Sequence, residues 1–160
     1  MPKQGQLFLH FYIIGKNILN EMSIKELLEE CKTIAVVGIS RETTKDSHIV
    51  SKYMQEKGYH IIPINPNSPE ILGEKCYPQL LNIPEELQKK IDVVNIFRPS
   101  KDVNQIILDT IKIKENTGAI KVIWMQLGII NQEATNEAEK HGLLAVMDRC
   151  IMVEHKKYLK

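Results

Sequence analysis

The sequence predicts an α/β fold, namely a single domain built on a doubly wound, mostly parallel sheet. Two observations lead to this prediction. Short runs rich in β-branched residues alternate with segments of helical periodicity between residues 33 and 147. In addition, the 160 residues are enough for one ordinary domain, and no linker, repeat or low-complexity tract divides them.

Six segments have the composition of strands. They are residues 33–37, 60–64, 75–77, 92–96, 120–124 and 143–147. The first has the sequence TIAVV, a continuous run that is typical of a parallel strand buried between two layers of helices. The segment 75–77 is the weakest and is expected at one edge. Since crossovers between parallel strands are right-handed, few topologies remain, and the preferred strand order is 3-2-1-4-5-6.

The first two predicted helices precede and follow the first strand. A capping box at Ser23 and Glu26 is expected to begin the earlier one. Its apolar stripe consists of Ile24, Leu27, Leu28 and Cys31. The later one has an apolar face made of Ile49, Val50, Tyr53 and Met54. Gly58 is expected to end it, because glycine readily adopts the backbone conformation that terminates helices.

The remaining helices are expected between the later strands. Residues 82–88 are predicted to form a short helix with Pro84 in its first turn. Ser100 is the expected cap of a longer helix. The apolar face of that helix is Val103, Ile106, Ile107 and Ile111. A mostly polar helix is expected over residues 131–141, with Ala134, Ala138 and His141 on one side, and the charged residues 154–160 are expected to form a tail.

The N-terminal segment differs from the rest of the chain. Residues 7–14 are apolar, but they are too few to span a bilayer and no small-x-small cleavage site follows them. Met22 opens a much more domain-like sequence. We therefore expect residues 1–21 to be an extension outside the fold and residues 22–160 to be the domain.

Composition and charge argue against several classes of function. The chain has 21 Lys and Arg against 20 Asp and Glu, so its formal net charge is +1. This balance gives no basic footprint for nucleic acid and no polybasic patch for a membrane surface, so neither partner is expected. Cys31, Cys76 and Cys150 form no C-x-x-C pair, which argues against a disulfide framework or a zinc cage. Unpaired cysteines fit a reducing compartment, and a cytoplasmic location is expected.

The first candidate site is the loop after the first strand. Ligands of open parallel sheets bind beyond the carboxyl ends of the strands, and Gly38 occupies such an end. A glycine there lets the backbone turn tightly and approach a phosphate. Ser40 and Ser47 would add hydroxyl groups, while Arg41 and Lys45 would add charge. The loop is neither G-x-G-x-x-G nor a Walker A motif, and a plain strand-to-helix turn explains it equally well.

The end of the second strand modifies this interpretation. Dinucleotide-binding domains for NAD usually place an acidic residue there to hold the ribose diol. This chain has Asn65 followed by Pro66, which removes both the acceptor and a charge that would repel a phosphate. The pattern therefore favours a ligand with a phosphorylated ribose, such as NADP or coenzyme A. The alternative is that Asn65 and Pro66 only begin a turn.

The end of the fourth predicted strand supplies a cation. Arg98 lies between Phe97 and Pro99, and a guanidinium at this point can contact a phosphate through two N–H groups. Pro63 and Pro99 would stiffen the two walls and offer flat apolar surfaces to an adenine. A structural salt bridge of Arg98 is the alternative.

Other chemistry-bearing residues give no pattern. Trp124 and Met125 are interpreted as core or pocket wall. The histidines share no metal-ligand spacing, and no nucleophile, base and acid can be assembled from local spacing. Cys150 lies beside Arg149, but a lone cysteine is more often inert. We predict no catalytic residue and no metal site.

Together these residues resemble a known family, the small CoA-binding proteins of bacteria and archaea. These are single Rossmann-like domains similar to the N-terminal domain of the succinyl-CoA synthetase alpha subunit. The segments that carry the resemblance, in chain order, are IAVVGIS, KGYHIIPINP, ILGEKCYPQL, DVVNIFRPS, VIWMQLGI and MDRCIMVEH. They cover nearly the whole domain, from about residue 33 to residue 155. The resemblance implies a Rossmann-like fold and a coenzyme A or acyl-CoA ligand.

The resemblance also implies which residues contact the ligand. The implied contacts are Gly38 and Ser40 for the phosphates, Lys45 and Ser47 for the nucleotide, Pro63 and Asn65 for the adenosine, Phe97, Arg98, Pro99 and Ser100 for the opposite wall, and Gln126 and Gly128 for the exit of the pantetheine arm. Lys45 stands where arginine is common in the family, so a two-point phosphate contact is in doubt there.

Three functions compete on this basis. The preferred one is binding of CoA or an acyl-CoA through its ADP and 3′-phosphate part, as a sensor, carrier or accessory module. Ligase chemistry is not expected, because the synthetases need a second domain for which this chain leaves no room. The first alternative is an NADP-dependent oxidoreductase. The second is a non-catalytic subunit that completes an acyl-CoA synthetase in trans, which would require a protein partner, whereas the module itself is compatible with a homo-oligomer.

Overall fold

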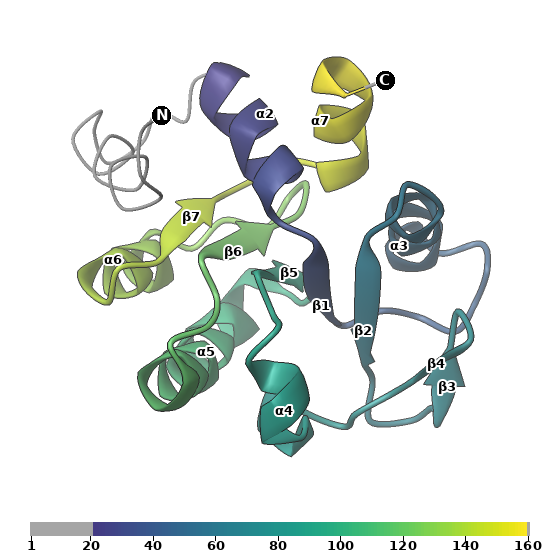
Figure 1. Ribbon diagram of the computed structural model, residues 1–160, viewed down its shortest axis with the longest axis horizontal. Coiled ribbons are helices and arrows are strands. Elements are labelled where there is room, and N and C mark those ends of the chain that lie inside the picture. The colour runs from purple at the N-terminus through teal and green to yellow at the C-terminus, as the bar shows by residue number, and fades with distance from the viewer. Residues whose placement is uncertain (1–20, 160) are drawn as a thin grey trace.

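The computed structural model describes residues 21–159 and has a five-stranded parallel sheet at its centre (Figure 1). The strands are β1 (Thr33–Val37), β2 (His60–Ile64), β5 (Val93–Ile96), β6 (Val122–Met125) and β7 (Leu144–Val146). Their order across the sheet is β2-β1-β5-β6-β7, and all four neighbouring pairs are parallel. The predicted α/β class with a doubly wound parallel sheet is therefore confirmed.

The predicted third strand is wrong, so the sheet lacks the strand expected outside β2. Residues 70–75 form a separate antiparallel ribbon of β3 (Glu70–Ile71) and β4 (Glu74–Lys75). Only Tyr77 reaches the sheet, through a single bridge to Ile64. Pro78 has no N–H group to continue the pairing, so this edge cannot extend further.

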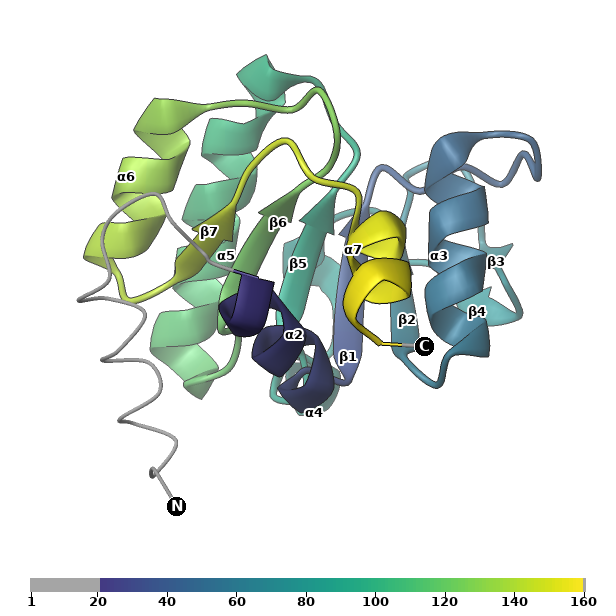
Figure 2. The same ribbon diagram turned by 90° about the horizontal axis from the view of Figure 1, so that it is seen from above.

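Helices cover both faces of the sheet. The helices are α2 (Glu21–Glu30), α3 (Asp46–Glu56), α4 (Glu85–Gln88), α5 (Val103–Thr117), α6 (Gln132–Lys140) and α7 (Ile151–Tyr158), with two short 3₁₀ turns at Leu80–Asn82 and Ser100–Asp102. Figures 1 and 2 show α2, α3 and α7 on one face and α4, α5 and α6 on the other. None of the helices within residues 21–159 is long and apolar enough to cross a membrane.

Several helix boundaries differ from the prediction. Helix α4 begins at Glu85 and not at residue 82, and Pro84 occupies its N-cap position and not its first turn. Helix α2 already includes Glu21, so it begins before the expected cap at Ser23; the rest of the predicted extension, residues 1–20, lies outside the described residues. Ser100 does not cap α5, because a 3₁₀ turn intervenes and Asp102 occupies the N-cap position. The expected charged tail is helical instead, since α7 runs from Ile151 to Tyr158.

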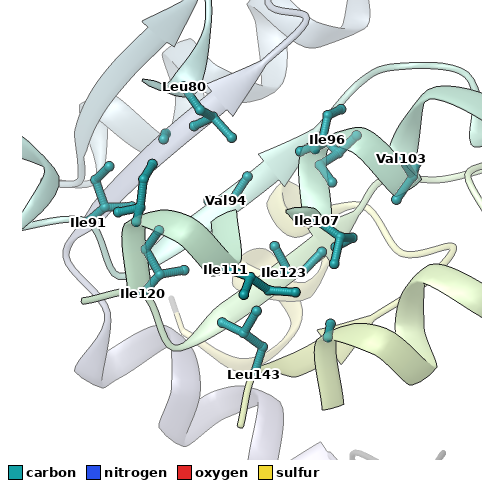
Figure 3. Close-up of a cluster of buried hydrophobic side chains, with 14 of the residues drawn as sticks. Leu80, Ile91, Val94, Ile96, Val103, Ile107, Ile111, Ile120, Ile123 and Leu143 are labelled. Atoms are coloured by element: carbon teal, nitrogen blue, oxygen red, sulfur yellow. The ribbon is translucent and has the colours of Figure 1, made fainter. Parts of the chain in front are cut away.

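Two apolar clusters sandwich the sheet. Along β1, Ile34 and Val36 face one cluster and Ala35 faces the other, as alternation along a strand requires. Figure 3 shows the cluster on the side of α4, α5 and α6, which includes Val94, Ile107 and Ile123. The cluster under α2, α3 and α7 contains Trp124, which is fully buried, so the core interpretation of this residue is confirmed. Its indole Nε1 donates a hydrogen bond to the carbonyl of Arg149.

A buried histidine joins α7 to the rest of its layer. His155 is 6% exposed, and its Nδ1 lies 2.9 Å from the Tyr53 hydroxyl of α3. The Tyr53 and Tyr59 rings meet the imidazole edge to face at centroid distances of 5.5 and 5.7 Å. Burial lowers the pKa of His155 below its usual 6.5, and the charges of Lys57 and Lys32 lower it further.

This pKa shift predicts how stability depends on pH. The unfolded chain takes up a proton at His155 near pH 6.5, whereas the folded protein resists it. We therefore expect the free energy of unfolding to fall as pH drops below 6.5. Urea denaturation across this range should show a shallower loss in His155→Gln than in the wild type, and His141→Gln, at an exposed position, should behave like the wild type. An unchanged pH dependence in His155→Gln would contradict the assignment.

Candidate functional site

The candidate site lies at the carboxyl edge of the sheet, where the direction of the connections reverses. From β1 the chain crosses through α3 to β2, and it then returns past β1 to β5 on the other side. In sheets of this kind, a crevice opens between the loops that leave the two diverging strands. Here those loops begin at Gly38, after β1, and at Phe97, after β5, and Figure 2 shows the helices that flank them.

Gly38 allows the two loops to touch. Its φ is +90°, a conformation that residues with a side chain rarely adopt. A Cβ at this position would lie 2.8 Å from the carbonyl oxygen of Phe97 and 3.0 Å from Cδ of Arg98. The aliphatic part of Arg98 therefore packs directly over the bare backbone of Gly38. The structure brings together the two features that the sequence placed 60 residues apart.

The loop after Gly38 is held from the first turn of α3. The Ser40 N–H donates to Oγ of Ser47 at 2.9 Å, and the Ser40 carbonyl lies 2.9 Å from Nδ1 of His48. Because a carbonyl only accepts, Nδ1 of His48 carries a proton. Oγ of Ser40 in turn accepts from the Glu42 N–H at 3.0 Å. Both serine hydroxyls accept in these bonds, so neither bond uses the hydroxyl proton.

Sequence reasoning missed His48, which lies in the first turn of α3 and holds this loop. It is 8% exposed and lies one position after the predicted Ser47. Its role depends on a hydrogen bond across eight residues, and no spacing rule distinguishes it from any other histidine in the first turn of a helix.

Asn65 connects the ends of two strands. Its Nδ2 donates to the Ile39 carbonyl at 2.8 Å, and its Oδ1 accepts from the Asn67 N–H at 2.7 Å. An aspartate could accept but not donate, so an amide is required for this pair of bonds. The turn suggested by Asn65 and Pro66 is thus present. Pro63, in β2, is buried in the sheet.

Two of the exposed cations at this edge, Arg98 and Lys45, each have an acidic neighbour. Nη2 of Arg98 lies 2.9 Å from Oδ2 of Asp102, and Nζ of Lys45 lies 3.8 Å from Oε2 of Glu42. The Arg98 and Lys45 side chains are 51% and 63% exposed, so both pairs are weak and solvent-screened. Asp102 uses only part of the Arg98 guanidinium, which has five N–H donors. Of the two cations, Lys45 is the more exposed.

The remaining predicted residues form a second layer of loops along the same edge. Oγ of Ser100 accepts from the Ile130 N–H at 3.1 Å, and the Gly128 N–H donates to Oδ1 of Asp148 at 2.7 Å. Gln126 is different, because it is only 3% exposed. Its amide lies 2.7 Å from the side chain of Asn95 and accepts from the N–H of Ile151 at 3.4 Å. Gln126 therefore supports the edge from beneath.

A cleft of about 410 Å³ lies elsewhere, between α3 and α7. Its lining includes Lys52, Tyr53 and Met152, together with His48. Among the predicted ligand contacts, none lines this cleft. We place the candidate site at the open carboxyl edge, because the convergent polar groups and the close approach of the two loops are there.

Within residues 21–159 the structure offers no cluster of metal ligands, and two of the three thiols, those of Cys31 and Cys76, are buried. No group of three or more His, Cys, Asp or Glu side chains in that range is arranged to hold a metal ion. Burial raises the pKa of the Cys31 thiol to about 12, with Asp92 adding to the shift, and burial also raises the pKa of Cys76. Thiols of this kind are poor nucleophiles. Arg149, the neighbour of Cys150 in the sequence, forms an ion pair of its own, because its guanidinium lies 3.7 Å from the carboxylate of Glu154.

Comparison with known proteins assigns the family. The sequence model of the CoA binding domain matches residues 32–156, which span all the strands and the candidate edge. The chain belongs to the CoA binding domain family. The family resemblance inferred from the sequence motifs is thereby confirmed.

Relatives of this CoA binding domain include both small proteins and large ligases. The chain is 40% identical over 136 residues to the uncharacterized protein YneT of Bacillus subtilis, covering 85% of this chain and 94% of YneT. A hypothetical protein from Pyrococcus horikoshii has a similar structure, with a TM-score of 0.80 and 41% identity over 89% of this chain and 94% of that one. ADP-forming acetate–CoA ligase I of Archaeoglobus fulgidus is 29% identical over 126 residues, 75% of this chain but only 18% of the ligase. This CoA binding domain is thus homologous to one part of such ligases.

Proposed function

We propose that this protein binds coenzyme A or an acyl-CoA at the carboxyl edge of its sheet, through the ADP and 3′-phosphate part of the ligand. The single observation that carries the proposal is the contact between the Gly38 loop and Arg98 at the switch point, in a chain of the CoA binding domain family. A backbone without a Cβ next to a half-exposed guanidinium suits a diphosphate.

The proposed contacts follow the loops outward from this point. The ligand diphosphate would lie against Gly38, with the hydroxyls of Ser40 and Ser47 as donors. Asn65 would border the adenosine on the β2 side, with the buried Pro63 supporting it from within the strand. The remaining proposed contacts are Phe97, Pro99 and Ser100 on the β5 side, Arg98 and Lys45 at the phosphates, and Gly128 along the pantetheine arm, where the buried Gln126 supports the loop from beneath.

In this proposal the protein is a sensor, carrier or accessory module of the cytoplasm rather than a ligase. Binding of CoA needs no general base, and we assign no catalytic residue. The three cysteines are free, which agrees with a reducing compartment. A partner that supplies or takes up the ligand, or a second copy of the chain, would complete such a role.

A calorimetric titration with CoA, dephospho-CoA, NADP and NAD in parallel tests the proposal. We expect CoA to bind, and dephospho-CoA to bind more weakly because it lacks the 3′-phosphate. Tighter binding of NADP than of CoA would favour the oxidoreductase instead. Absence of binding by all four would contradict the proposal and favour a subunit that needs its partner.

A further inference from the structure

One loop of the ligand edge exposes apolar side chains to water. Leu127 and Ile130, between β6 and α6, are 72% and 55% exposed. They are the two most exposed large hydrophobic residues within residues 24–159. Scattered exposed leucines are ordinary in proteins, but here the two largest values fall three residues apart on a single loop.

This loop is fixed to the rest of the candidate site. The Ile130 N–H donates to Oγ of Ser100, and the side-chain amide of Asn131 donates to the Ser100 carbonyl at 2.9 Å. On the other side, the Gly128 N–H is bonded to Asp148. The two apolar residues are therefore held next to the loop that follows β5, which carries Arg98. An apolar surface that is already in position loses little entropy when a ligand covers it.

The charges around the loop restrict what can cover it. Residues 126–131 have the sequence QLGIIN and carry no charge. The nearest charged group bonded to the loop is the carboxylate of Asp148, 2.7 Å from the Gly128 nitrogen. A neutral aliphatic chain would bury apolar surface here, whereas a carboxylate would lose its water without a cationic partner within residues 126–131.

We infer that Leu127 and Ile130 form a platform for the acyl chain of an acyl-CoA, and that the protein prefers neutral aliphatic acyl groups. This inference rests on the proposed function. With the phosphates at Gly38 and Arg98, the acyl end is the part of the ligand that extends furthest from them. The platform adjoins Ser100, next to the loop that carries Arg98, on the side where the proposed function places the pantetheine arm.

Titration with CoA, acetyl-CoA, octanoyl-CoA and succinyl-CoA tests the inference. Since burying two methylene groups is worth about tenfold in affinity, we expect octanoyl-CoA to bind at least about tenfold tighter than CoA. Succinyl-CoA is expected to bind more weakly than octanoyl-CoA. In a Leu127→Ser/Ile130→Ser variant, the affinity ratio of octanoyl-CoA to CoA should fall towards one. Leu108→Ser, a matched change on the exposed side of α5 at 46% exposure, should keep the wild-type ratio.

Several outcomes would overturn the inference. If CoA binds and octanoyl-CoA binds no tighter, the platform is rejected while the proposed function stands. If the double variant keeps the wild-type affinity ratio of octanoyl-CoA to CoA, the acyl chain binds elsewhere on the protein and the inference is rejected. If the wild type sediments as a dimer and the double variant as a monomer, the platform is a subunit interface and the inference is rejected. If no CoA species binds, both the inference and the proposed function fail.

Discussion

Replacing Gly38 with alanine is expected to lower the free energy of unfolding by about 2–5 kcal/mol and to abolish measurable CoA binding. The positive φ alone costs a residue with a Cβ about 1–2 kcal/mol. The new Cβ would also lie 2.8 Å from the Phe97 carbonyl, a backbone atom that cannot move without shifting β5. Overpacking of this kind costs about 1–3 kcal/mol more. Urea denaturation measures the loss of stability, and calorimetric titration measures the loss of CoA binding.

Gly58 provides the matched control for this substitution. Its φ is +96°, close to that of Gly38, but a Cβ there would meet nothing within 4 Å. Gly58→Ala should therefore show only the conformational cost of about 1–2 kcal/mol and leave binding intact. Equal losses of stability in the two variants would mean that the contact with Phe97 does not restrict the loop.

Replacing Arg98 with alanine is expected to weaken CoA binding by about 1.5–3 kcal/mol, the range for a hydrogen bond to a charged group. Stability should change little, because the ion pair of Arg98 with Asp102 is exposed. Calorimetric titration of the folded variant measures the loss. Titration with dephospho-CoA shows which phosphate is involved, since a contact confined to the 3′-phosphate would leave dephospho-CoA unaffected.

Two neighbours of Arg98 serve as controls. Lys101→Ala removes an equal charge from an exposed position on the same turn, and should cost far less affinity if the Arg98 contact is direct. Asp102→Ala breaks the ion pair while keeping the guanidinium, and should preserve or strengthen binding by removing a negative charge near the phosphates. If Asp102→Ala weakens binding as much as Arg98→Ala, then the ion pair, and not a phosphate contact, explains Arg98.

The parts of the fold that could be predicted were those with a local signal. The strand at residues 33–37 is a continuous β-branched run, and its prediction matched β1 to the residue. The segment 75–77, Lys-Cys-Tyr, is shorter and has no β-branched residue, and whether it pairs with β2 depends on Pro78 and on the ribbon before it. Helix α7 was missed because Ile151 and His155 are its only fully buried positions, too few to give a periodic stripe.

The candidate site was predictable at the level of loops but not of contacts. Gly38 and Arg98 follow predicted strands, and the topology of a doubly wound sheet brings such strand ends together. Ser100 shows where this reasoning stops. A serine before a helical segment suggests a cap, yet its hydroxyl bonds to Ile130, a partner 30 residues away. The burial of Gln126 likewise depends on its contacts with Asn95 and with the start of α7. No local sequence pattern predicts these contacts.

The side-chain bonds that link the loops of the ligand edge have a thermodynamic consequence. Ser47 holds the first loop, Ser100 joins the loop after β5 to the one after β6, and Asp148 holds that loop from the other side. The conformational entropy of these segments is therefore already lost when the chain folds. The ligand should then meet a protein surface that is already formed, and the entropy lost on ordering should come mainly from the ligand itself. Its heat-capacity change would report only the apolar surface that the ligand and the edge remove from water, without a contribution from coupled folding.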